Sequence, residues 1–384
     1  MGQYFEIAAL GHRRILPKAF IKLGEFLFHH PTAADLAALL AVPVRPTLQS
    51  INGRSKYTSL QLAQGAGNVE KTKGNALKSK APQQVQYANH KNLAAAATAT
   101  RPDKHMGLFK LPPELQVYIF ESIDHIAGVI CFGLTNRFHW SIAQEHLLNF
   151  YMTRLGQWAN QKIICVGDYV RCDDLPRGMV LSQEWQEWLE SFEREESEDE
   201  EPKDDGPVTL YHIVCSFRQQ RVESVHSIRS DLDLQLFDME VYDDPAFRVY
   251  KDFARSLRED DFFPKNEDWI LRNLTTKQYV RSDAVALNPK YINGPNIGLV
   301  GFGEVVLSRI AWTSDPSVSM QNDTDIHRGR WAGHCFDITT MARHQRKTLG
   351  QIWTDVSEEV AQEIDLIWTS EFGSDWKKQA CESL

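Results

Sequence analysis

The sequence predicts an α+β fold, a mixed sheet that carries helices, and three kinds of segment support this class. Short apolar runs at 4–10 and 162–166 have the length and composition of buried strands, and residues 269–281 form two more strand candidates joined by a polar turn. Stretches at 23–40 and 356–368 place apolar residues at helical spacing. The chain has 384 residues and a hydrophobic fraction of 42%, which suffices for two or three domains with a sizeable core.

Further elements are expected in the second half of the chain. Apolar strings indicate strands at 211–215 and 331–338, and a third at 305–307 that follows several structural glycines. Residues 228–257 are expected to be mostly helical, and an amphipathic helix that starts near Ser357 closes the chain. The N-terminal segment is too short to fold alone, so we expect it to join a later part of the chain.

Two stretches have the composition of disordered linkers. Residues 43–105 are rich in Gln, Asn, Ala, Ser and basic residues and poor in aromatic ones, so they cannot bury enough apolar area to offset the entropy of ordering. Residues 193–207 carry a dense block of acidic side chains, which repel one another and keep a segment extended. We therefore expect a basic linker and an acidic loop.

Net charge and cysteine usage argue against several classes of protein. A net charge of −9 argues against nucleic-acid binding as the main function. The sequence shows neither a run of about 18 apolar residues nor a secretory signal, so we expect no membrane partner. The cysteines lack a C-x-x-C pair and mostly lie in apolar strings, which predicts buried, reduced thiols in a cytoplasmic or nuclear protein. They are Cys131, Cys165, Cys172, Cys215, Cys335 and Cys381.

Residues 111–143 carry the most specific pattern in the chain. The opening Leu-Pro-Pro-Glu-Leu predicts a helix start, because proline fits the first turn and the glutamate faces the positive end of the helix dipole. Apolar residues then recur on one face, and a second apolar group leads into a segment that combines aromatic residues with an arginine. Short helices with this much apolar surface must bury a face against another body.

The same pattern resembles the F-box, a three-helix module that docks on a Skp-type adaptor and so joins a cullin-RING ubiquitin ligase. The resemblance implies an F-box-like module at 106–150, with the rest of the chain recruiting an unknown protein substrate. It also implies a subunit of the ligase that is not itself an enzyme and uses no cofactor. The residues that match the family pattern and are expected to bind the adaptor are Leu111, Pro112, Leu115, Ile119, Phe120, Ile123, Leu134, Arg137 and Phe138.

A second resemblance covers much of the remaining chain. Several strings are similar to the successive signatures of a family of uncharacterised, largely fungal proteins, some of which contain an F-box. Their order implies that residues 1–42 and 151–384 form one α+β domain into which the linker and the helical module are inserted. Two of the strings share the pattern Gly-x-Trp-Ala before a strand, starting at Gly156 and Gly329. The strings lie at 1–7, 22–26, 158–169, 273–280 and 329–333.

Two alternatives to the ligase interpretation stay open. On an extended segment Asp323, Asp325 and His327 point to one side and can hold a divalent metal, with His334 and Asp337 nearby. The spacing fits no established metal motif, and Asp and Asn are also the usual residues of a surface loop. The α+β domain would then have its own ligand or a metal-dependent hydrolytic site. The other alternative is an interaction scaffold without a link to ubiquitin. A cleft that contains the predicted metal site would include three more polar residues only if the fold brings them together. These residues are Asp168, Glu304 and Arg309.

Overall fold

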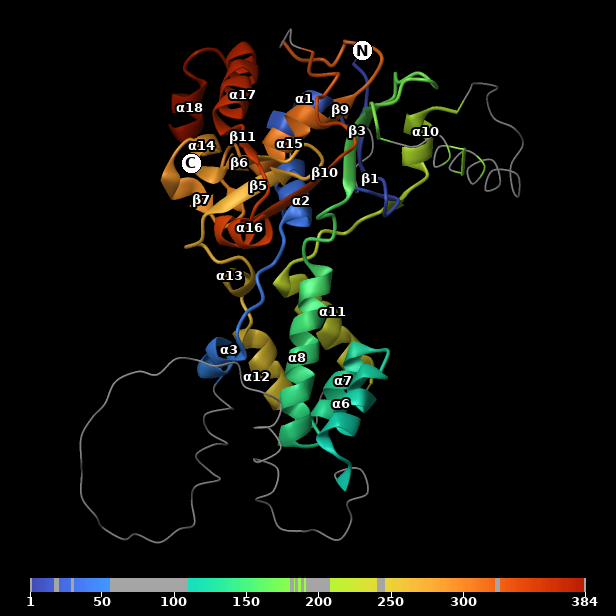
Figure 1. Ribbon diagram of the computed structural model, residues 1–384, viewed down its shortest axis with the longest axis vertical. Helices are drawn as coiled ribbons and strands as arrows, with labels where there is room; N and C mark the ends of the chain where they lie inside the picture. Colours follow the sequence, from blue (N-terminus) through green and yellow to red (C-terminus); the bar gives the residue numbers. More distant parts are fainter. Residues whose placement is uncertain are drawn as a thin grey trace, which may run out of the picture. The chain divides into compact units, whose positions relative to one another are not determined.

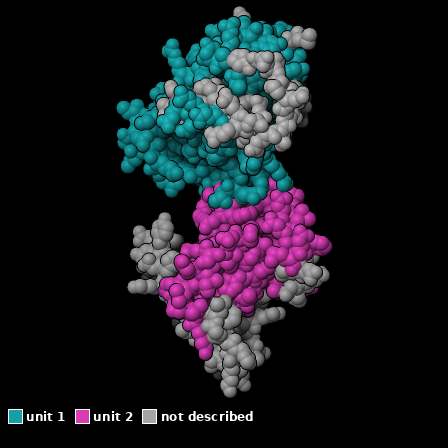
Figure 2. Space-filling view, turned by 90° about the vertical axis from the view of Figure 1, so that its right-hand side faces the viewer, with its two compact units in different colours: residues 1–44, 153–224, 259–384 teal, residues 45–152, 225–258 magenta. Residues whose placement is uncertain are grey.

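The computed structural model divides by its contacts into two compact units, which Figure 2 colours separately. Unit 1 comprises residues 1–44, 153–224 and 259–384, and unit 2 comprises residues 45–152 and 225–258. The chain therefore passes from unit 1 to unit 2 and back twice. The structure describes residues 2–16, 21–28, 31–55, 110–179, 183, 186–187, 190, 208–239, 246–321 and 325–382.

Unit 1 is built on a mixed sheet of nine strands among the described residues, which confirms the predicted α+β class (Figure 1). The strand order is β11-β6-β5-β10-β3-β1-β2-β4, and β9 pairs with β3. A small separate sheet contains β7 and β8. The strands are β1 (Phe5–Ala9), β2 (Arg14–Ile15), β3 (Lys162–Gly167), β4 (Arg218–Gln219), β5 (Trp269–Asn273), β6 (Gln278–Arg281), β7 (Ile292–Asn293), β8 (Asn296–Ile297), β9 (Ala311–Trp312), β10 (His334–Thr340) and β11 (Thr354–Asp355).

Helices pack on the central strands of this sheet. Helices α2 and α15 pack against each other, and α2 also contacts β10 while α15 contacts β3. Helix α10 packs on β1 and β3, and α16 packs on β10. The helices of unit 1 that lie wholly within the described residues are α1 (Leu23–Phe28), α2 (Thr32–Leu40), α10 (Leu210–Cys215), α13 (Glu259–Phe262), α14 (Ser282–Val285), η3 (Pro289–Tyr291), α15 (Phe302–Ile310), α16 (Met341–Lys347), α17 (Ser357–Phe372) and α18 (Trp376–Glu382). The strands predicted at 162–166 and 269–281 and the helix starting near Ser357 are confirmed.

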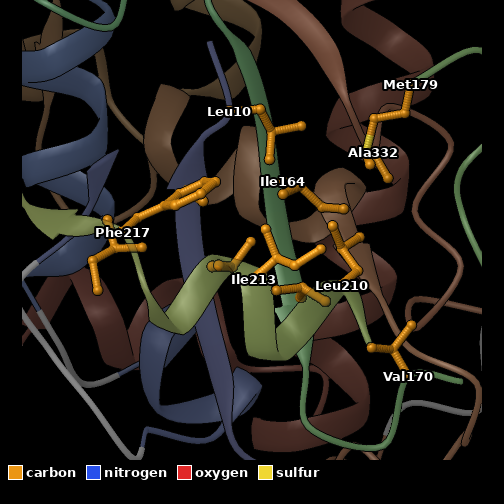
Figure 3. Close-up of a cluster of buried hydrophobic side chains, with 12 residues drawn as sticks. Leu10, Ile164, Val170, Met179, Leu210, Ile213, Phe217 and Ala332 are labelled. Carbon is orange, nitrogen blue, oxygen red and sulfur yellow. The ribbon is translucent and has the colours of Figure 1, made fainter. Parts of the chain in front are cut away.

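The prediction of a strand at 211–215 is wrong, because this segment forms helix α10. Leu210, Ile213 and Val214 lie at i, i+3 and i+4 and are buried against β1 and β3, as Figure 3 shows for Leu210 and Ile213. Thr209 begins the helix with a capping box that it forms with His212. The apolar string is therefore one face of a helix.

The strand predicted at 305–307 is also wrong, because these residues lie in the middle of helix α15. All residues of α15 except Glu304 are buried, so the helix shows no polar face from which a helical period can be read. A Cβ atom on Gly303 would lie 1.8 Å from the carbonyl oxygen of Ala33, so this glycine allows α2 and α15 to approach closely. The glycines before the apolar run thus serve helix packing.

Two domain assignments differ from the sequence prediction. Within the predicted linker 43–105, residues Leu48–Arg54 form helix α3, whose Ile51 is fully buried. Residues 225–258, assigned to the α+β domain, group with unit 2 because Trp140 and Phe253 pack edge to face and because helices of this segment contact α3 and α7. Residues 56–105 and the predicted acidic loop 193–207 lie outside the described residues.

The cysteine prediction is only partly right. All six thiols are free, but Cys172 and Cys215 are exposed and Cys165 alone among the six is fully buried. Cys215 is the last residue of α10 and lies away from the buried face of that helix. An apolar sequence context therefore did not place each thiol in the core.

The sheet of unit 1 contains an internal two-fold repetition. Its halves, β1-β2-β3-β4 and β5-β6-β10-β11, meet where β3 and β10 pair in antiparallel fashion, and in each half the outermost pair is parallel. Ala9 pairs with Arg14 across a loop, and Asn273 pairs with Gln278 across a loop of equal length. By this register the equivalent positions are Ala8 and Arg272, Arg14 and Gln278, Ile164 and Asp337, and Arg218 and Thr354.

The two Gly-x-Trp-Ala strings form the same turn in the two halves. Trp158 and Trp331 each donate a backbone hydrogen bond of 2.8 Å to a carbonyl at the end of α2 or α15, and both side chains are buried. In both turns the residue after the alanine has a left-handed backbone conformation, with φ of 68° at Asn160 and 74° at Gly333. Asparagine tolerates this region better than most residues, so Asn160 keeps the turn that glycine makes in the other half.

Glu6 on β1 makes the stability of unit 1 depend on pH. Its side chain is 3% exposed, its Oε2 atom is buried without a hydrogen-bond partner among the described residues, and burial raises its pKa from 4.5 to about 7. Because the folded pKa lies above the unfolded value, the contribution of Glu6 to stability is fully present below pH 4.5 and is lost as pH rises through 7. The loss amounts to about 3 kcal/mol at 1.36 kcal/mol per pKa unit.

We expect Glu6→Gln to change the unfolding free energy little at pH 5 and to raise it by about 2–3 kcal/mol at pH 8, relative to the wild type. Urea denaturation of both chains at the two pH values measures the difference. Burial also raises the pKa of Glu304 to about 7, but this contribution is common to both chains and cancels. An equal effect of the substitution at both pH values would contradict the prediction.

Candidate functional site

The segment that resembles the F-box forms three consecutive helices in unit 2 (Figure 1). Pro113 is the first residue of the first helix, as the sequence predicts, and the third helix runs to Arg154, beyond the predicted end of the module at 150. In the part of unit 2 that the structure describes, the helices are α3, α6 (Pro113–Glu121), α7 (Ile126–Gly133), α8 (Arg137–Arg154), α11 (Val225–Asp238) and α12 (Phe247–Ser256).

The three helices share a small apolar core to which each contributes one fully buried residue, namely Phe120, Val129 and Ala143. Phe120 is 1% exposed, and its ring lies 4.7 Å from the ring of Phe132. Phe120, predicted as an adaptor contact, therefore offers almost no surface to a partner in this structure, because the module uses this side chain to hold itself together. Ile123, also predicted as a contact, is half-buried against the same core.

A buried polar network ties the start of α8 to α6. His139 is fully buried, and its Nε2 lies 2.7 Å from Oε1 of Gln116. The amide of Gln116 donates to the carbonyl of Leu111, while Oγ1 of Thr135 lies 2.8 Å from Nδ1 of His139. Burial lowers the pKa of His139, which favours the neutral ring, and its Nδ1 can then accept from the side-chain amide of Asn136 at 2.9 Å. Gln116 and His139 belong to the motif segment, but nothing in its pattern singles them out.

A row of motif residues on α6 faces solvent. Pro112 and Leu115 are exposed, Leu115 to 49%, and Ile119 is half-buried. Tyr118, which the sequence did not single out, is 66% exposed on the same side. These positions follow the i, i+3, i+4 spacing of one helix face. We call Pro112, Leu115, Tyr118 and Ile119 the α6 face. Of the remaining predicted contacts, Arg137 is exposed and Leu111, Leu134 and Phe138 are half-buried.

Gly133 at the end of α7 allows α7 and α8 to approach closely. A Cβ atom at this position would lie 2.4 Å from Cβ of Ala143. We expect Gly133→Ala to destabilise unit 2 by about 1–3 kcal/mol through overpacking. Gly53→Ala is the matched control, because Gly53 is also helical but has open space at its Cβ position, and we expect it to stabilise by about 0.5–1 kcal/mol. Urea denaturation measures both, and equal effects would contradict the packing argument.

The described residues of the predicted metal site do not come together as a group of ligands. Asp325 and His327 lie in a region of bends and turns and not on a strand. His334 lies 2.9 Å from the amide of Asn273, and Asp337 is paired with Arg272. Within the described part of the chain, no group of three or more His, Cys, Asp or Glu residues has metal-ligand geometry. Asp323 lies outside the described residues.

The three further polar candidates have separate structural roles. Glu304 accepts the N–H of Gly301 and caps α15, and Asp168 accepts the N–H of Tyr4. Arg309 is 2% exposed, pairs with Glu359 on α17 at 3.0 Å, and stacks on Trp331. No described contact joins these side chains to one another.

Comparisons with protein-family models, with curated proteins and with solved structures found no match for the chain. Among the described residues, no helix has the length and apolar character needed to span a membrane. The residues and their geometry therefore carry the functional argument.

Proposed function

We propose that the chain is a substrate receptor of a Skp-cullin-RING ubiquitin ligase and that unit 2 carries an F-box-like module. The α6 face is the observation on which the proposal depends. It combines residues of the Leu-Pro-x-Glu-Leu pattern with an apolar row that is exposed to solvent, Leu115 to 49% and Tyr118 to 66%. Exposed apolar rows on otherwise packed helices are typical of surfaces that bind another protein.

In this proposal a Skp-type adaptor covers the α6 face, and Arg137 and the half-buried Leu134 and Phe138 extend the contact. Unit 1 recruits the protein target. The chain acts in the cytoplasm or the nucleus, contributes no catalytic group and uses no cofactor. The internal core around Phe120 keeps the α6 helix in place and does not itself touch the adaptor.

Co-purification of the full chain with a Skp-type adaptor tests the proposal. We expect Leu115→Asp combined with Ile119→Asp to weaken the interaction at least about 100-fold, since lost apolar burial and desolvated carboxylates together cost ~3 kcal/mol or more. The matched control is Leu366→Asp on α17 of unit 1, where the side chain is 64% exposed, and it should retain the adaptor. Leu115→Asp alone, at an exposed position, should act in the same direction without disturbing the fold.

Absence of adaptor from the wild-type preparation would contradict the proposal. Equal recovery of adaptor with the wild type and the double variant would also contradict it, because the α6 face would then not be the contact.

A further inference from the structure

A polar pocket of about 370 Å³ lies at the β2–β4 edge of the sheet in unit 1. Its size is within the ~300–1,000 Å³ range of small-molecule sites, but such sites are usually lined by apolar side chains. Every residue lining this pocket has a polar side chain that can form hydrogen bonds. The lining residues are His12, Arg14, Thr153, Gln157 and Gln220.

Two arginines face each other beside this pocket. Strands β2 and β4 pair in parallel, and Arg14 lies directly opposite Arg218. Residues in register on neighbouring strands project from the same face, and like charges in that arrangement destabilise the pair. Among the described residues, neither arginine has a carboxylate partner. A bound anion would remove this repulsion.

The chain segments around the pocket are basic. Segments 11–16, 153–162 and 216–222 together contain six Lys and Arg residues and no Asp or Glu, in a chain whose net charge is −9. Arg154 pairs with Glu223, and Nζ of Lys162 donates to a backbone carbonyl. Arg13, Arg14 and Arg218 have no carboxylate partner in the described part of the chain, and together they leave a local positive potential that attracts anions.

The second half of the sheet shows that the fold does not require these arginines. The positions equivalent to Arg14 and Arg218 are occupied by Gln278 and Thr354, which are uncharged. At that edge Arg281 pairs with Asp355 at 3.1 Å, so its charge is balanced. The facing arginines are therefore particular to the β2–β4 edge, which points to a ligand.

We propose that the β2–β4 pocket binds a phosphate monoester. Such a group carries a charge of about −1.5 to −2 and three strong acceptor oxygens. Guanidinium groups match phosphate oxygens in pairs. The side-chain oxygen of Gln157 accepts from Gln220, which leaves the amide nitrogen of Gln157 as a neutral donor in the pocket lining. A phosphorylated side chain and a free small phosphate ester share this chemistry. Assignment to a phosphorylated target rests on the proposed function, whereas phosphate binding itself does not.

Calorimetric titration of the full chain at low salt tests the pocket with four probes. They are inorganic phosphate, glycerol 3-phosphate, a short peptide with one phosphoserine, and its unphosphorylated counterpart. We expect the phosphopeptide to bind at least tenfold more tightly than the unphosphorylated peptide. Tighter binding of the phosphopeptide than of glycerol 3-phosphate identifies a protein source, and the reverse order supports the pocket but identifies a small ester.

The double variant Arg14→Gln with Arg218→Thr introduces the residues that the other half of the sheet already uses, so it should fold. We expect it to lose at least tenfold in affinity for the phosphorylated probes, while Arg346→Gln at an exposed position of α16 changes nothing. Unchanged affinity in the double variant would overturn the inference, as would failure of every phosphorylated probe to bind. No adaptor is present in this titration, so its failure leaves the adaptor proposal standing.

Discussion

Asp337→Ala is expected to lower the unfolding free energy of unit 1 by about 3–5 kcal/mol, because it leaves a buried guanidinium without its partner. Arg272 and Asp337 face each other across β5 and β10, and their side chains are 8% and 4% exposed. Nε donates to Oδ1 at 2.8 Å and Nη2 to Oδ2 at 2.6 Å, so the pair is bidentate. The Arg272 guanidinium also lies against His344 and the ring of Trp353.

Replacing both partners should recover most of this stability. The equivalent positions in the other half of the sheet are Ala8 and Ile164, which are apolar and fully buried. We therefore expect Arg272→Leu combined with Asp337→Ile to lie within about 2 kcal/mol of the wild type, since a well-packed apolar pair often replaces a buried ion pair at little cost. Urea denaturation followed by tryptophan fluorescence measures the unfolding free energy of Asp337→Ala and of the double variant. A double variant as unstable as Asp337→Ala would show that the loss comes from packing and not from an unpaired charge.

Phe120→Ala should destabilise unit 2 by about 3–5 kcal/mol, the usual range when a large core side chain is truncated. The ring contacts Phe132 and His139 at centroid distances of 4.7 and 5.7 Å, so its removal opens the core shared by α6, α7 and α8. Hydrogen exchange of the backbone amides in these helices is the measurement, and faster exchange throughout them is expected.

Leu115→Ala is the control on the same helix. The Leu115 side chain is 49% exposed, so its truncation should change the free energy of opening measured by exchange by no more than about 0.5 kcal/mol. If Phe120→Ala left exchange unchanged but abolished adaptor binding, Phe120 would be a contact residue and its role in the core would be refuted.

The type of element was predicted correctly where the apolar pattern is typical of one kind of element alone. Continuous apolar runs such as that of β3 and the amphipathic spacing of α17 gave the correct type of element. The prediction was wrong for α10 and α15. Helix α10 is short and α15 is buried on almost all sides, and the apolar run of such a helix resembles that of a buried strand. For α10 the capping box at Thr209 and the spacing of Leu210, Ile213 and Val214 were signals that the sequence contained.

The candidate site was predictable in outline and not in detail. The motif located the three helices, but it did not separate Leu115, which faces solvent, from Phe120, which fills the core, because both are apolar and burial depends on neighbouring helices. The pairing of Arg14 with Arg218 depends on two short strands far apart in the sequence, and β4 is too short to give a pattern of its own. Long-range register of this kind appears only in the fold.

Calorimetric titration of purified Skp-type adaptor into the purified full chain tests the proposed adaptor contact most directly. We expect saturable binding at one adaptor per chain, lost in the Leu115→Asp and Ile119→Asp double variant and retained in Leu366→Asp. Absence of binding to the wild type, or binding that the α6 double variant leaves intact, would contradict it.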